Sequence, residues 1–131
     1  MTFDSKPEST RGLRVLVVED DFLIAQHMAM MLSDLGCVVI GPEGKADRAA
    51  AVARSQPLDG AVMDINLGGQ TQYALIETIF DIGIPIVLTT GYAMPDLPPR
   101  LRGCPRLRKP VGQRELAQAI GRTFRHISRP T

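Results

Sequence analysis

The chain has 131 residues, 44% of them hydrophobic, and a formal net charge of +1. This length fits one domain with its own core, and no stretch resembles a membrane span or a signal peptide. Residues 1–12 are mainly polar, so we expect a flexible N-terminus and a cytoplasmic protein that does not bind a membrane.

The first predicted strand, at residues 13–18, is an apolar run that leads directly into the acidic residues Glu19, Asp20 and Asp21. Asp21 is a suitable N-cap for a helix that Gly36 closes. The core-facing positions of this helix follow a helical spacing: Ile24, Met28, Met31, Leu32 and Leu35.

A second stripe on the same helix consists of Leu23, His27 and Met30. It is less polar than a fully solvated face should be. The stripe either contacts a partner protein or borders the core.

Two strand–helix pairs are predicted next. A short strand at 37–40 and a turn at 41–44 precede an alanine-rich helix at 45–54. The following strand, at 58–63, leads to Asp64. Taken alone, Asp64 is either a loop cap or a reactive carboxylate at the ligand-binding edge of a sheet.

After Asp64 we expect a glycine loop and a third helix that ends at Gly83. The apolar positions of that helix are Tyr73, Ile76, Ile79 and Phe80. A strand at 85–89 follows, with proline tolerated at its first position.

Residues 91–104 contain three prolines, so only one short turn around Arg100 is expected there. A brief edge strand at 106–109 leads to the last helix, which starts at Gln113. Its apolar face is Leu116, Ile120, Thr123, Phe124 and Ile127.

The end of the chain is basic. Residues 1–99 hold 6 Lys/Arg against 13 Asp/Glu, whereas residues 100–131 hold 9 against 1. Such a surface is a solvated face, a site for an acidic protein, or a nucleic-acid site. No DNA-reading motif is present, so we expect no direct contact with nucleic acid.

This alternation of strands and helices predicts an α/β fold, a parallel sheet with helices on both faces. The strand ends then bring Glu19 and Asp20, Asp64, Thr90 and Lys109 to one edge. Clustered carboxylates repel one another, and Mg²⁺ relieves that repulsion. With a hydroxyl and a lysine, they form a set suited to a phosphoryl group on Asp64.

Four spaced motifs carry a family resemblance: Val18-Glu-Asp-Asp21, Met63-Asp-Ile-Asn66, Leu88-Thr-Thr-Gly91 and Lys109-Pro110. In this order they resemble the receiver domains of two-component response regulators over residues 13–127, leaving a tail at 128–131. The resemblance implies a flavodoxin-like, doubly wound five-stranded parallel sheet of order 2-1-3-4-5. The three prolines predict that the fourth helix of that fold is short or degenerate here.

By resemblance, Asp64 is the phosphoacceptor and Glu19 and Asp20 are the acidic pair, with Asp20 as the direct Mg²⁺ ligand. Asn66 would give its backbone carbonyl to the same metal. Thr90 matches the switch hydroxyl. Lys109 matches the phosphate-binding lysine, whose bond to the following proline is often cis in the family.

Two features depart from typical receivers. Arg106 occupies the position of an inward-swinging aromatic residue. The segment Pro85-Ile-Val-Leu-Thr-Thr-Gly-Tyr92 is instead similar to the Pro-Phe-x-Phe-Ala-Thr-Gly-Tyr signature of a subgroup, often single-domain, that works in phosphorelays. Residues 91–104 are therefore expected to relay the signal, with a fixed proline-braced cover as the alternative, and Tyr92 to lean over the phosphoryl group.

The resemblance implies a stand-alone response regulator without an output domain. It takes phosphoryl from a histidine kinase or histidine phosphotransfer protein and signals through a downstream protein, with at most slow self-dephosphorylation. The alternatives are a pseudo-receiver that acts without phosphorylation and an aspartyl-nucleophile phosphatase, although Asn66 stands where the phosphatase needs a second acid. The family's strand order places Cys37 and Cys104 near opposite sheet edges, which argues against a disulfide.

Overall fold

The structure is a computed structural model that describes residues 10–91 and 96–126. Five parallel strands form its main sheet in the order β2-β1-β3-β6-β7. Their bounds are β1 Arg14–Val18, β2 Val38–Glu43, β3 Gly60–Asp64, β6 Ile86–Thr90 and β7 Arg106–Arg108. Counted over this sheet alone, the order is the predicted 2-1-3-4-5.

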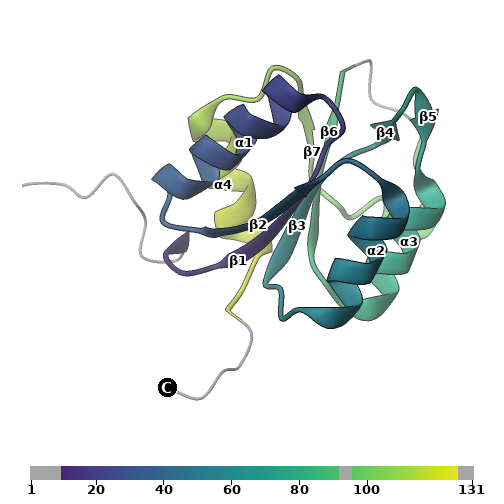
Figure 1. Ribbon diagram of the computed structural model, residues 1–131, viewed down its shortest axis with the longest axis horizontal. Coiled ribbons are helices and arrows are strands. Elements are labelled where there is room, and N and C mark those ends of the chain that lie inside the picture. The colour runs from purple at the N-terminus through teal and green to yellow at the C-terminus, as the bar shows by residue number, and fades with distance from the viewer. Residues whose placement is uncertain (1–9, 92–95, 127–131) are drawn as a thin grey trace, which may run out of the picture.

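Within the described residues, four α-helices cover the sheet: α1 Phe22–Asp34, α2 Ala46–Ser55, α3 Tyr73–Ile82 and α4 Gln113–Thr123. Figure 1 shows α1 and α4 on one face and α2 and α3 on the other, so the predicted flavodoxin-like, doubly wound α/β fold is confirmed. None of the helices in the described part of the chain is both long and apolar enough to cross a membrane.

The core lies in two layers because successive strand residues point to opposite faces of the sheet. Toward α1 and α4 lie the strand residues Val15, Val17, Val62 and Val87. Toward α2 and α3 lie Leu16, Val18, Met63 and Leu88. The central strands are thus buried on both faces and leave only their ends for chemistry.

The first helix starts and ends as predicted. The Asp21 carboxylate accepts a hydrogen bond from the Ile24 amide at 3.1 Å, and Gly36 adopts φ +86°, which favours glycine. Ile24 is the exception to the predicted core face, since it is 38% exposed and lies at the rim of two pockets.

Residues 10–12 are held in place, contrary to the prediction of a flexible N-terminus. The buried Thr10 hydroxyl donates to the Leu35 carbonyl at 2.8 Å, and the Gly12 amide donates to the Gly36 carbonyl at 2.7 Å. The remainder of the predicted N-terminus and the C-terminal tail at 128–131 lie outside the described residues.

The second strand is longer than predicted. It runs to Glu43, through residues expected to form a turn. Pairing with β1 shifts from Leu16–Ile40 to Val18–Glu43, so Gly41 and Pro42 form a bulge instead of ending the strand.

The predicted glycine loop after Asp64 is a small hairpin formed by β4, Asn66–Leu67, and β5, Gln70–Thr71. Gly68 and Gly69 have φ of +59° and +79°. Two successive residues with positive φ fit the tight turn that joins antiparallel strands, and glycine adopts that conformation without strain.

The last helix is shorter than its apolar pattern predicted. α4 ends at Thr123, and Phe124 has extended backbone angles and a buried side chain. A Cβ atom on Gly60 would lie 2.4 Å from the Phe124 ring, so the ring packs directly on the start of β3. Ile127 lies outside the described residues.

The connection between β6 and β7 was predicted to hold a short or degenerate helix, and its described part, 96–104, contains no α-helix. One short 3-10 helix, η2 Pro99–Leu101, forms there as predicted, and Leu97, Leu101 and Cys104 are buried against the α2 and α3 side of the core. Arg100 forms ion pairs with Glu77 and Asp81 on α3 and lies 5.3 Å from the centre of the Phe80 ring. Most of this crossover is therefore packed against α3.

Both cysteines are buried and free, which confirms that no disulfide joins them. Tyr92 and the prediction attached to it fall at 92–95, outside the described residues.

Candidate functional site

The carboxyl ends of the strands form an acidic pocket of about 350 Å³. Asp64 is the last residue of β3, Glu19 and Asp20 follow β1, and Lys109 follows β7. The lining of the pocket is Glu19, Asp20, Asp21, Ile24, Asp64, Asn66, Gly69, Gly91 and Lys109. The predicted convergence of acids and lysine is therefore what the fold produces.

Lys109 bridges two of the acids. Its Nζ donates to Asp64 Oδ2 at 2.8 Å and lies 2.7 Å from Glu19 Oε1. Burial by itself lowers the pKa of Lys109, but hydrogen bonds to Asp64 and Glu19 and the charges of both acids outweigh it, so the pKa is raised. The lysine stays charged and faces the Asp64 carboxylate directly. The Lys109–Pro110 bond is cis.

Glu19 is the buried member of the acidic pair. Its Oε2 accepts a hydrogen bond from the Asp21 amide at 3.0 Å. Burial raises the pKa of Glu19, the hydrogen bond from Lys109 opposes that rise, and the negative charge of Asp64 adds to it. A second positive charge in the pocket would therefore favour the ionised form of this acid.

Asp64 and Asp20 are each held by a backbone amide. The Asn66 amide donates to Asp64 Oδ1 at 3.1 Å, and the Gly68 amide donates to Asp20 Oδ2 at 2.7 Å. Glu19, Asp20 and Asp64 each offer a carboxylate oxygen, and these oxygens lie within 4.8 Å of one another. Such a set of hard oxygen donors fits a small divalent cation.

Thr90 lies beside the pocket without contributing to its lining, as far as the structure describes the chain. It is buried at the end of β6, and its carbonyl accepts a hydrogen bond from the Lys109 amide at 2.8 Å. The preceding residue, Thr89, points to the α1 side of the sheet and lines a different cavity. The role of Thr90 as the switch hydroxyl stays a prediction.

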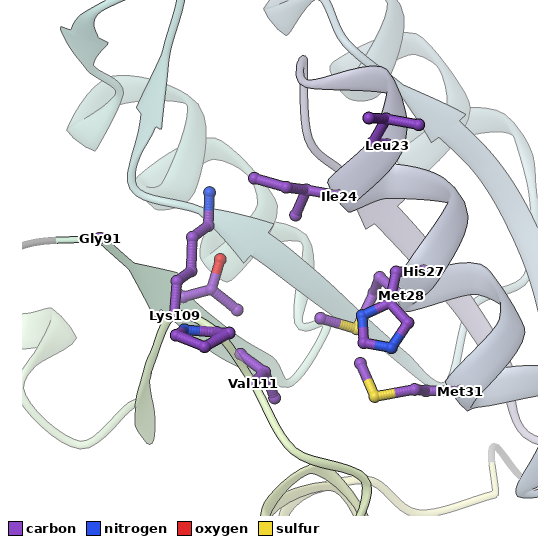
Figure 2. Close-up of a pocket in the computed structure, with 10 residues that line it drawn as sticks. Leu23, Ile24, His27, Met28, Met31, Gly91, Lys109 and Val111 are labelled. Atoms are coloured by element: carbon purple, nitrogen blue, oxygen red, sulfur yellow. The ribbon is translucent and has the colours of Figure 1, made fainter.

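An apolar cavity of about 430 Å³ adjoins the acidic pocket and shares Ile24, Gly91 and Lys109 with it. Figure 2 shows Leu23, His27 and Met31 of α1 on one side of this cavity, with Lys109 and Val111 on the other. On the exposed part of α1, the side chains of Leu23 and Met30 are 75% and 63% exposed. Leu23 and His27 of the predicted stripe therefore line the apolar cavity, and all three stripe residues are exposed to solvent.

Comparisons with known proteins place this geometry in a family, although no family model matches the chain. It is 30% identical over 120 residues to the uncharacterized transcriptional regulatory protein YbdJ of Bacillus subtilis, covering 88% of this chain and 52% of that protein. It spans about half the length of the curated relatives it matches.

Two solved structures extend the match. The solution structure of SdrG from Sphingomonas melonis has a TM-score of 0.72 and 30% identity, and the match covers 86% of this chain and 95% of that one. The response regulator PhyR from Brucella abortus has a TM-score of 0.73 and 26% identity over 89% of this chain and 50% of that one. The chain belongs to the receiver-domain family of response regulators.

In this receiver domain, the site residues predicted from the sequence lie close together. Asp64, Glu19, Asp20, Asn66 and Lys109 line one pocket, while Thr90 is one step outside it. Convergence was predictable because parallel strands end at one edge.

Two contacts of the hairpin were missed. The Gly68 amide holds Asp20, and the Thr71 hydroxyl donates to Asn66 Oδ1 at 3.1 Å. The Gly-Gly dipeptide was the available signal, because it is a common two-residue turn between antiparallel strands. Nothing in the spacing of Thr71 indicates its partner.

Proposed function

We propose that this receiver domain accepts a phosphoryl group on Asp64 from the phosphohistidine of a histidine kinase or histidine phosphotransfer protein in the cytoplasm. The observation that carries the proposal is the pairing of Asp64 with the Lys109 ammonium at 2.8 Å, inside a pocket that three further acids line. A buried acid that faces both a fixed cation and a solvent-open pocket is arranged for attack on an electrophile.

The transfer is a displacement at phosphorus. An Asp64 carboxylate oxygen forms the new P–O bond, the P–N bond of the phosphohistidine breaks, and the leaving imidazole nitrogen keeps the electron pair. Lys109 is already bonded to Asp64 Oδ2, so its charge is in place to offset the incoming phosphoryl oxygens.

The three acidic side chains fit Mg²⁺, with the backbone carbonyl of Asn66 as a further donor. When bound, the cation neutralises the pocket and polarises the phosphoryl oxygens. The charge of the cation would also favour the ionised form of the buried Glu19, because the hydrogen bond from Lys109 does not bring the pKa of Glu19 down to its usual value.

A relative supports the proposal. SdrG, whose fold this chain shares, has also been solved in a BeF₃-activated conformation, with a TM-score of 0.70 and 28% identity to this chain. By analogy, we expect a phosphoryl mimic to bind to the Asp64 carboxylate in this chain.

The two alternatives are less well supported. A phosphorylation-independent pseudo-receiver does not require the Asp64–Lys109 pair, which is intact and partly buried. A phosphatase of the aspartyl type needs a second acid two residues after the nucleophile, where this chain has Asn66. We therefore propose a phosphoacceptor that has at most slow self-dephosphorylation as a catalytic activity, and that signals to a downstream protein.

Incubation with a small phosphodonor separates the three functions. We expect one stable acyl phosphate per chain in the presence of Mg²⁺ and little in the presence of a chelator. Asp20→Asn should require more Mg²⁺, and Lys109→Ala should still be labelled but fail to signal. No labelling would favour the pseudo-receiver, and continuous release of phosphate would favour the phosphatase.

A further inference from the structure

The hairpin that follows the phosphoacceptor holds a side chain at the edge of the acidic pocket. The Thr71 hydroxyl on β5 donates to Asn66 Oδ1 on β4 at 3.1 Å, and the two residues are paired directly across the hairpin. Thr71 itself is exposed and does not line the pocket. Its visible contact with the site therefore runs through Asn66.

Asn66 is close to the acceptor in two respects. Its amide donates to Asp64 Oδ1 at 3.1 Å, and the residue lines the acidic pocket. A phosphoryl group on Asp64 would enter the same pocket. The Asn66 carboxamide would then lie close to the phosphoryl group, where it could contact a water molecule that attacks phosphorus.

The hairpin fixes this arrangement. Gly68 and Gly69 form the tight turn, and the Gly68 amide is bonded to Asp20 on the opposite side of the pocket. The hydrogen bond from Thr71 thus holds the carboxamide oxygen of Asn66 toward β5, while backbone amides of the hairpin are hydrogen-bonded to Asp20 and Asp64.

We propose that Thr71 is a positioning residue that lengthens the life of the phosphorylated state by holding the Asn66 carboxamide oxygen away from attacking water. This inference rests on the proposed phosphorylation of Asp64. In hydrolysis, a water oxygen forms a bond to phosphorus, the P–O bond to Asp64 breaks, the carboxylate leaves with the electron pair, and a water proton passes to solvent or to phosphate. A carboxamide oxygen released by Thr71 accepts a hydrogen bond from that water and orients it.

The test compares acyl phosphate lifetimes after removal of the small phosphodonor, with Mg²⁺ present. Thr71→Val removes the hydroxyl at nearly constant shape, and Thr71→Ser restores it. Thr78→Val is the matched control, because the hydroxyl of Thr78, a half-buried threonine, also makes a side-chain hydrogen bond, to the Ala74 carbonyl within α3 and away from the pocket. Asn66→Ala and Asn66→Ala/Thr71→Val complete a double-mutant cycle.

We expect Thr71→Val to shorten the lifetime roughly fivefold, the effect of about one hydrogen bond, while Thr71→Ser and Thr78→Val match the wild type. In the Asn66→Ala background, Thr71→Val should change nothing, a result that a general loosening of the fold would not give. An unchanged or longer lifetime in Thr71→Val, or equal shortening in the Asn66→Ala background, overturns the inference alone. Absence of labelling in the wild type overturns the proposed function, and the inference with it.

Discussion

Cys37 shows at the scale of one residue how burial sets chemistry in this fold. Its side chain is 8% exposed, and its thiol faces the Thr10 carbonyl, with Sγ 3.5 Å from that oxygen. Burial, with a smaller contribution from the charge of Asp59, raises the pKa of Cys37 to about 11. A thiol in this state is a poor nucleophile at neutral pH, because the thiolate is the reactive form.

The raised pKa of Cys37 predicts a loss of stability in alkali. Between the ordinary thiol pKa of 9.0 and about 11, the folded chain keeps a proton that the unfolded chain has lost. The free energy of unfolding therefore falls as pH rises through this window, by on the order of 2 kcal/mol, and is unaffected below it. Denaturant titrations at pH 8 and pH 10.5 should show a larger loss for the wild type than for Cys37→Ala, and equal losses would contradict the assignment.

At the scale of elements, the periodic segments were predictable and their ends were not. The apolar spacing on α1 and the apolar runs of β1 and β3 are local signals, and each element formed where it was expected. Phe124 fits the helical pattern of α4 equally well, yet its ring packs on Gly60. That contact joins residues far apart in the sequence, so no local pattern contains it.

The Phe124 contact predicts an unusual sensitivity at Gly60. Gly60→Ala should lower the free energy of unfolding by about 2 kcal/mol, because its Cβ would overlap the ring. Gly103→Ala is the control, since a Cβ there meets nothing within 4 Å. Denaturant unfolding of both variants measures the difference, and similar stability would show that the ring does not occupy this position.

The exposed part of α1 is the element we expect to meet the phosphodonor protein. Leu23→Asp or Met30→Asp should slow phosphotransfer from a histidine kinase roughly tenfold or more, as the loss of a buried apolar contact at an interface does. Labelling by a small phosphodonor should be unchanged. Ile82→Asp is the control, because Ile82 is an apolar residue, 42% exposed, on α3 at the other face of the sheet. A loss in both assays would mean that the fold, and not the interface, had been damaged.

At the scale of the whole molecule, the acidic pocket is built from two distant parts of the chain. The acids of the pocket come from the first half of the chain, while the lysine that completes the pocket comes from its basic end. The sheet order brings both to one edge, with the crossover at 96–104 held to α3 on the outside. We therefore propose that phosphorylation is read through Lys109, Thr90 and this crossover, whose described part, 96–104, holds one 3-10 helix and no α-helix.

The central claim is that Asp64 is the phosphoacceptor, and intact mass after incubation with a small phosphodonor and Mg²⁺ tests it most directly. Asp64→Asn removes the proposed nucleophile at nearly constant shape, and Asp34→Asn makes the same change at an exposed acid at the end of α1. We expect the wild type and Asp34→Asn to gain the mass of one phosphoryl group and Asp64→Asn to gain none. Undiminished labelling of Asp64→Asn would contradict the account.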